Sequence, residues 1–183
     1  MSKVNLSILL GDITVQEVDV MVNSIHPSCR PGLGVAGAIH RQGGAEIYQE
    51  CQQIHAQRGH QDLAIGEYIV TNPGRLPAKR IVHISAPRWL EHSEQAQPEL
   101  TECYVSVINY ADSAGFKSIA IPAIGTGVFR FPFELAMQAA LVGIQKASLQ
   151  CHSLEEIRLV FFKEHYYQQA RVMIQQFVQS QVE

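Results

Sequence analysis

Two glycine-containing segments have the residue types to bind an anion through their backbone amides. PGLG spans residues 31 to 34, and GTGVF spans residues 125 to 129 after the apolar run SIAI. Glycine permits positive φ and a close backbone approach, so successive amides can converge on anionic oxygens. Each segment also leads into residues with helical spacing, and the N-terminal end of a helix favours a phosphate group. Together they predict a clamp for a diphosphate, although tight turns would require the same glycines.

The charge balance and the missing motifs exclude several other kinds of anion binder. Neither glycine segment has the spacing of the dinucleotide fingerprint or of the GxxxxGK[ST] loop. The 183 residues include 14 Lys and Arg against 17 Asp and Glu, a formal net charge of −3. This balance provides no electrostatic footprint for duplex nucleic acid or for an anionic membrane, and we expect neither as a partner. An anionic ligand would therefore depend on local donors such as the glycine amides.

The cysteines and the N-terminal residues indicate a cytoplasmic protein. The four cysteines have no CxxC pair and no zinc-type spacing, so we expect reduced thiols, no metal and no cofactor. The stretch MSKVNLSILLGDITV contains an apolar run that Gly11 and Asp12 interrupt, too short for a signal sequence or a membrane span. The cysteines are Cys29, Cys51, Cys103 and Cys151.

The order of the apolar segments predicts a three-layer α/β/α fold in a single domain, residues 1–183. Short apolar or β-branched runs alternate with longer segments of helical spacing, a pattern typical of a mainly parallel sheet covered on both faces. The expected strands are 6–13, 18–25, 66–71, 80–86, 118–124 and 157–162. The expected helices are 36–57, 98–114, 132–149 and 165–179.

Local signals refine these boundaries and place the candidate site. Pro98 and Pro132 suit the first turn of a helix, and Gly115 suits a helix end. The polar connection 88–99 is predicted to be a surface loop. Ligands of open α/β sheets bind beyond the carboxyl ends of the strands. The segments expected there are 11–14, 22–44 and 122–132.

Five stretches, in this order and spacing, resemble a macrodomain. They are GDIT, VDVMVNS, GLGVAGAIHRQGG, GEYIVTNPGRLPAKRIVHISAPRW and SIAIPAIGTGVFRFP. The resemblance covers nearly the whole chain and ends with LVFFKE before the last helix. It implies a mixed, largely parallel sheet between helices and a cleft that binds ADP-ribose.

The resemblance assigns the adenine end of the cleft to two separate parts of the chain. Asp12 would accept a hydrogen bond from the adenine amino group, and Ile13 would contribute a backbone amide. Phe162 would stack against the adenine, and Phe161 would point into the core on the opposite face of the strand. Two alternatives stay open, since Asp12 could instead cap a turn and the two phenylalanines could exchange roles.

By the same resemblance, the two glycine segments become the phosphate loops. Phe129 would lie near the distal ribose, or would pack in the core as most aromatic residues do. His40 and His83 are interpreted as scaffold, because one falls within a helix and the other within a buried strand. One loop would use Gly32, Gly34, Val35 and Ala36, and the other would use Gly125, Thr126, Gly127, Val128 and Phe129.

The chain departs from the family pattern where a hydrolytic member would orient water. The family's strand usually ends NAAN, whereas this chain reads NSIH, so Asn23 is kept and His26 takes the second asparagine's place. An imidazole can donate to or accept from the same hydroxyl, but it is bulkier and titrates near neutral pH. Leu33 and Ala36 also depart from the glycine triplet and acidic residue of many hydrolytic members. Asn23 and His26 are the candidate catalytic residues, and water, rather than Cys29, would be the attacking group.

Two functions follow from this cleft. The first is a hydrolase of low activity, which removes mono-ADP-ribose from acidic side chains or deacetylates O-acetyl-ADP-ribose. The second is a non-catalytic module that recognises ADP-ribose or a mono-ADP-ribosylated protein. The two hypotheses differ in what the distal ribose contacts, which makes His26 the decisive residue.

Overall fold

A single six-stranded sheet forms the centre of the protein. The computed structural model describes residues 4–89 and 93–180. The strand order is β1-β6-β5-β2-β4-β3, and every neighbouring pair is parallel except β3 with β4. The predicted mixed, largely parallel sheet is thereby confirmed. The strands are β1 Asn5–Leu10, β2 Val20–Ile25, β3 Tyr68–Thr71, β4 Arg80–Ser85, β5 Ser118–Pro122 and β6 Glu156–Phe161.

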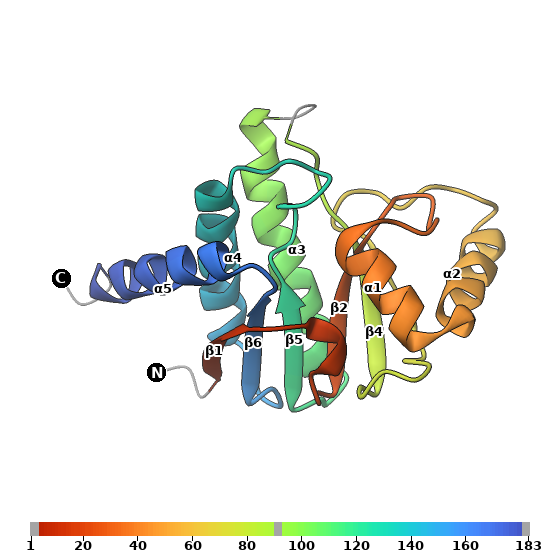
Figure 1. Ribbon diagram of the computed structural model, residues 1–183, viewed down its shortest axis with the longest axis horizontal. Coiled ribbons are helices and arrows are strands. Elements are labelled where there is room, and N and C mark those ends of the chain that lie inside the picture. Colours follow the sequence, from red (N-terminus) through yellow and green to blue (C-terminus); the bar gives the residue numbers. More distant parts are fainter. Residues whose placement is uncertain (1–3, 90–92, 181–183) are drawn as a thin grey trace.

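Helices cover both faces of this sheet, which confirms the predicted three layers. Helices α1 and α2 lie on one face, α3 and α4 lie on the other, and α5 extends beyond the β1 edge (Figure 1). No helix in residues 4–89 and 93–180 is long and apolar enough to cross a membrane. The helices are the 3-10 turn η1 Ile13–Val15, α1 Gly34–Gly43, α2 Ala45–Gln57, α3 Ser93–Ser113, α4 Phe133–Ser148 and α5 Glu164–Gln179.

The alternation of side chains along β2 divides the buried residues between two cores. Val20 and Val22 belong to the larger core beneath α3 and α4, whereas Met21 and Ile25 belong to the smaller core beneath α1 and α2. Successive side chains of a strand point to opposite faces, so a strand covered on both sides is apolar in both registers. Asn23 shares the parity of Met21 and Ile25, which directs its side chain towards α1 and α2.

The predicted helix 36–57 is wrong as a single element. It begins earlier, at Gly34, and divides at Gly44, where φ is +108°. A side chain on Gly74 would collide with the carbonyl oxygen of Gly43, so the loop before β4 presses against the break. Glycine at position 44 allows the chain to turn between α1 and α2, and glycine at position 74 allows a second segment to approach this turn closely.

The predicted surface loop 88–99 is also partly wrong, because α3 begins at Ser93. Residues 90–92 lie outside the described residues. Pro98, expected in a first turn, lies inside the helix and removes one backbone donor. Ala96 and Leu100 are four residues apart on one helix face, and both are completely buried. We infer that their packing outweighs the missing hydrogen bond.

The other two helix-boundary predictions agree better with the structure. Pro132 directly precedes the first residue of α4 and occupies its N-cap position. Gly115 has φ +78° just beyond the end of α3, and its amide donates to the carbonyl of Asp112 at 3.0 Å. Glycine in this left-handed conformation is a common helix terminator.

Two aspartates organise the loops at the amino-terminal end of the sheet. The Asp19 carboxylate accepts a hydrogen bond from the Lys117 amide at 2.8 Å and pairs with Lys79 Nζ at 2.7 Å. Asp112 Oδ1 accepts from the three successive amides of residues 152–154, at 2.9, 2.7 and 2.9 Å. Side chains thus satisfy the backbone donors where the chain enters β5 and β6.

Candidate functional site

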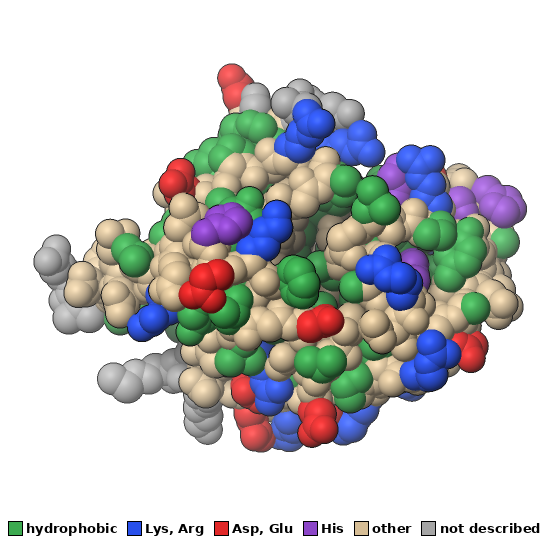
Figure 2. Space-filling view, viewed as in Figure 1, with side chains coloured by type: hydrophobic (Ala, Val, Ile, Leu, Met, Phe, Trp, Pro, Cys, Tyr) green, Lys and Arg blue, Asp and Glu red, His purple; other side chains and the backbone are tan. Residues whose placement is uncertain are grey.

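The carboxyl ends of the parallel strands lie beside a hollow in the molecular surface. Figure 2 shows this hollow near the middle of the face. Three large apolar side chains on the loops after β2, β5 and β6 are unusually exposed: Leu33 by 78%, Val128 by 71% and Phe162 by 79%. Because β6, β5 and β2 are neighbouring parallel strands, the loops that follow them lie at the same edge of the sheet. Exposed apolar side chains at one edge commonly mark a binding site. The predicted segments therefore meet at one edge of the sheet.

Asp12 combines a capping bond with an available carboxylate oxygen. Its Oδ1 accepts from the Thr14 amide at 2.8 Å and from Thr14 Oγ1 at 2.7 Å, and so caps η1. Within the described residues, Oδ2 has no hydrogen bond, so the capping role does not consume the whole carboxylate. Ile13 follows with its side chain buried in the smaller core. The cap proposed as an alternative is present, and it leaves one oxygen for a ligand.

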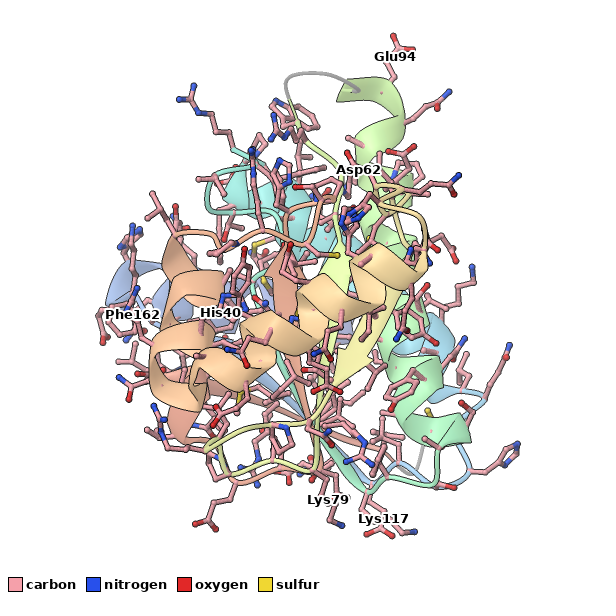
Figure 3. All side chains as sticks on the ribbon, turned by 90° about the vertical axis from the view of Figure 1, so that its right-hand side faces the viewer. His40, Asp62, Lys79, Glu94, Lys117 and Phe162 are labelled. Carbon is pink, nitrogen blue, oxygen red and sulfur yellow. The ribbon has the colours of Figure 1, made fainter. Side chains whose placement is uncertain are left out.

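The last strand separates its two phenylalanines. Phe161 is 2% exposed and packs edge-on against Phe133, with ring centroids 6.1 Å apart. Phe162 projects at the periphery of the molecule, as Figure 3 shows. The predicted inward direction of Phe161 is therefore confirmed, and Phe162 is the ring that a ligand could reach.

The loop between β2 and α1 offers unpaired backbone donors. Gly34 begins α1 with φ +64°, and Leu33 at the N-cap makes no capping hydrogen bond with its side chain. The first amides of a helix have no partner within the helix. Among the described residues, the amides of Gly34, Val35 and Ala36 have no other acceptor. Gly32 precedes them, so this loop has the donors that an anion requires.

This loop is held firmly against the rest of the molecule. Gln52 Nε2 donates to the carbonyl of Cys29 at 2.7 Å, and the Leu63 amide donates to the carbonyl of Pro27 at 2.9 Å. Cys29 is buried with φ +55°, and burial raises the pKa of its thiol. A buried thiol of raised pKa is a poor nucleophile, which agrees with the expectation against cysteine chemistry.

The loop between β5 and α4 has a similar set of unpaired donors. Gly125 has φ +86°, and its carbonyl accepts from the Phe131 amide at 3.0 Å. Thr126 Oγ1 donates to the carbonyl of Ala123 at 2.8 Å. In the part of the chain that the structure describes, the amides of Gly127 and Val128 make no hydrogen bond. The turn thus fixes the loop and leaves these two amides exposed.

Phe129 has the burial of a core residue. It is 7% exposed and belongs to the larger core. The guanidinium carbon of Arg88 lies over the Phe129 ring, 5.7 Å from its centre. These contacts favour the packing alternative for the ring, although the backbone of Phe129 still belongs to the glycine loop.

Asn23 lies in the interior, below the loop. It is fully buried, and its Nδ2 donates to His83 Nδ1 at 2.9 Å. Thr71 Oγ1 donates its one hydrogen to the carbonyl of Asn72 at 3.0 Å and therefore accepts from His83 Nε2 at 2.8 Å. Burial lowers the pKa of His83 to about 3, so the ring is neutral. This chain of bonds fixes the Asn23 amide away from the surface and favours a scaffold role.

A buried group of potential metal ligands lies beside the hydrogen bonds that join Asn23, His83 and Thr71. One ligand atom from each of His40, Cys51 and His83 lies within 4.8 Å of the others, and both ring nitrogens of His40 lack a hydrogen-bond partner among the described residues. Burial raises the pKa of Cys51 to about 12, so it is a thiol rather than a thiolate. His83 already uses both nitrogens, and a metal would have to break one of those bonds. Sequence reasoning missed this group because three separate elements bring it together.

His26 is the candidate catalytic residue nearest the surface, and two neighbours hold its ring. Arg30 Nη2 lies 2.8 Å from Nε2 and Ser28 Oγ lies 2.8 Å from Nδ1. Because a guanidinium only donates, Nε2 accepts from Arg30, while Nδ1 lies 3.2 Å from the Ser28 amide as well as beside the Ser28 hydroxyl. Burial lowers the pKa of His26, the charges of Arg30 and Arg88 lower it further, and Asp62 opposes them. Arg30 therefore covers Nε2, and the pKa of the ring lies below its ordinary value.

Comparisons with known proteins agree with this geometry. The model of the Macro domain family matches residues 22–140. An O-acetyl-ADP-ribose deacetylase of Escherichia fergusonii is 35% identical over 88% of this chain and 90% of its own length. A macro domain-containing protein of Listeria monocytogenes is 38% identical over 87% of this chain and 90% of its own length.

Solved structures of macrodomains share the fold. The Oceanobacillus iheyensis macrodomain with MES bound has a TM-score of 0.94 at 28% identity, covering 97% of this chain and 94% of its own. The Trypanosoma brucei macrodomain in complex with ADP-ribose has a TM-score of 0.81 at 26% identity, covering 92% and 68%. With its mixed sheet, its two glycine loops and these relatives, the chain belongs to the macro domain family.

Proposed function

We propose that this protein binds ADP-ribose, free or attached to a protein, at the carboxyl ends of β1, β6, β5 and β2. The observation that carries this proposal is the pair of loops after β2 and β5. Their amides at Gly34, Val35, Gly127 and Val128 have no acceptor within residues 4–89 and 93–180. These strands are neighbours in the sheet, so the loops are placed to bind the two halves of one diphosphate. The Trypanosoma brucei macrodomain in complex with ADP-ribose supports the same ligand.

The strand order gives the ligand a direction along the cleft. Asp12 follows β1 and Phe162 follows β6, so the adenine belongs at that edge. The diphosphate belongs between the loops after β5 and β2. The distal ribose would then lie on the far side, towards His26 and the end of β4. This direction leaves the attached protein at the opposite end from the adenine.

The surroundings of His26 support binding with slow hydrolysis. A water molecule attacking the distal ribose or its ester must be oriented, and a misplacement of about 1 Å can cost on the order of a hundredfold in rate. Asn23 is buried, and the basic nitrogen of His26 faces Arg30. The similarity to the deacetylase of Escherichia fergusonii favours some turnover of O-acetyl-ADP-ribose as a second activity of this protein.

The free thiols of the four cysteines support the reducing cytoplasm as the location of this protein.

Calorimetric titration with ADP-ribose and AMP tests the binding proposal. ADP-ribose should bind more tightly, because AMP cannot span both glycine loops. Absence of heat with ADP-ribose would contradict the proposed function, and equal affinity for AMP would remove the diphosphate clamp.

Single-turnover release from a mono-ADP-ribosylated protein tests the enzymatic part. Release by the wild type should be slow, and His26→Asn should accelerate it by restoring a smaller amide. His26→Ala should weaken ribose binding and leave AMP binding unchanged. Rapid wild-type release that collapses in both variants would instead make His26 the residue that orients or activates water.

A further inference from the structure

Basic side chains surround the hollow of a protein whose net charge is negative. The formal charge is −3, yet Figure 2 shows Lys and Arg side chains distributed around the hollow. A neutral cradle of amides can bind a diphosphate without them. Some of these cations are therefore available to bind another anionic group. The position of each cation in the fold indicates which part of a ligand it could reach.

Two exposed arginines lie on the neighbouring loops after β2 and β5. Arg30 follows β2 and is exposed, with one nitrogen on His26. Arg130 follows β5 and is also exposed, and its φ of +58° belongs to a turn closed by its amide on the carbonyl of Gly127 at 3.0 Å. Across the described part of the chain, neither arginine forms an ion pair. The fold thus holds two guanidinium groups without acidic partners.

The direction of the ligand places both arginines near the attached protein. The adenine end lies by β1 and β6, whereas β5 and β2 lead towards the distal ribose. Arg130 directly follows Phe129, and Arg30 contacts His26 beside the proposed ribose position. Asp62 is an acidic group whose charge acts on His26, and its carboxylate lies 3.7 Å from His55 Nε2. The two arginines therefore flank the loops of the proposed diphosphate clamp, Arg30 in contact with His26 and Arg130 next to Phe129 in the chain.

We infer that Arg30 and Arg130 form a docking surface for an acidic segment of the protein that carries the ADP-ribose. This inference rests on the proposed ADP-ribose site. Guanidinium groups bind carboxylates through two parallel N–H donors. Asp and Glu side chains on either side of the modified residue would supply these carboxylates. A short peptide fits better than a long polyanion, since the latter would also meet a net negative protein.

Two ADP-ribosylated peptides with a linkage that water does not cleave test this surface. One has Asp and Glu on both sides of the modified residue, and the other has Asn and Gln in their places. Fluorescence anisotropy with the full chain should show about tenfold tighter binding of the acidic peptide at low salt, since exposed ion pairs are individually weak but additive. The preference should shrink as salt screens the charges.

Matched variants assign the preference to these arginines. Arg130→Gln should lower the preference about threefold at low salt, while its affinity for free ADP-ribose stays that of the wild type. Arg30→Gln should lower the preference similarly and keeps an amide that can donate to His26. Arg171→Gln is the control, because Arg171 is exposed on α5 and stacks 5.9 Å from the Tyr167 ring. The control should keep the full preference.

Several outcomes would overturn the inference. Equal binding of the two peptides would do so while free ADP-ribose binding preserves the proposed function. An equal loss in Arg171→Gln and Arg130→Gln would reduce the effect to overall charge. Tighter binding of single-stranded RNA than of the acidic peptide would assign the arginines to nucleic acid. Absence of any ADP-ribose binding would remove the proposed function and this inference together.

Discussion

The two ends of the sheet are both built from loops, but they treat their backbone donors differently. At the amino-terminal end, Asp112 accepts three successive amides and Asp19 accepts another. At the carboxyl-terminal end, the amides of Gly34 and Gly127 remain without acceptors in the described residues. One end is satisfied by its own carboxylates, whereas the other is complementary to an external anion.

This difference teaches how a ligand site can be distinguished from a structural turn. Glycine and tight turns occur at both ends, as Gly115 and Gly125 show, so they do not identify function by themselves. A buried backbone donor requires a partner, and an exposed donor is satisfied by water that a ligand can replace. We therefore expect substitutions at one end to change binding and substitutions at the other end to change stability.

The largest expected effect is that of Gly127→Glu on ligand binding. The carboxylate would occupy the phosphate position and repel the diphosphate, so ADP-ribose affinity should fall by at least about a hundredfold. A Cβ on Gly127 would meet no atom within 4 Å, so circular dichroism should be unchanged. Gly127→Ala is the control without charge and should lose much less. Retained affinity in Gly127→Glu would reduce this loop to a simple turn.

Asp12→Ala should weaken ADP-ribose binding by about 1.5 to 3 kcal/mol, the range for hydrogen bonds to charged groups. It should also destabilise the protein by about 1 kcal/mol, because Asp12 caps η1. Asp12→Asn separates the two effects, since its oxygen can still accept from Thr14 while its amino group cannot accept from adenine. Calorimetry and urea unfolding measure them. Full affinity in Asp12→Asn would contradict the adenine contact.

Asp112→Ala should show the opposite behaviour. Three amides lose their acceptor, and we expect the free energy of unfolding to fall by about 1 to 2 kcal/mol, because water can reach these partly exposed amides. ADP-ribose affinity of the folded variant should be unchanged. A comparable loss of affinity would show that the two ends of the sheet are coupled, and would contradict their separate roles in stability and binding.

The smallest expected effect is the pH dependence of the stabilisation that Asp112 adds to the free energy of unfolding. Partial burial raises the pKa of Asp112, but its three backbone hydrogen bonds and the nearby His152 outweigh this, and the net pKa is lowered. The stabilisation is therefore complete above the unfolded pKa of about 3.9 and is lost as pH falls through the folded value. Urea unfolding of wild type and Asp112→Asn should converge at low pH. A constant difference would contradict the carboxylate's role.

The sequence predicted the strands and the glycine loops because their signals are local. Apolar runs and paired glycines are visible without knowledge of their neighbours. The start of α3 was missed because Ala96 and Leu100 are the buried residues of an otherwise polar segment. Gly44 was likewise read as part of a helix, since its break depends on the approach of Gly74.

The side-chain partners of the candidate catalytic residues could not be predicted. Asn23 binds His83 because the register of β2 beside β4 places them opposite each other, 60 residues apart in sequence. The resemblance gave Asn23 a catalytic role, whereas its burial favours a scaffold role. Arg30 is close to His26 in sequence, but its hydrogen bond depends on the conformation of the whole loop.

The pairing of β1 with β6 joins two strands that are about 150 residues apart in sequence, which has a consequence for synthesis. Asn5–Leu10 can complete its hydrogen bonds only when Glu156–Phe161 has left the ribosome. Such long-range parallel pairing is slow, because a large loop must close before the contacts form. Asp12 and Phe162 follow these two strands, so the proposed adenine end is the last part of the cleft to assemble. Recognition of the whole nucleotide must therefore await the synthesis of β6, long after β1 has been made.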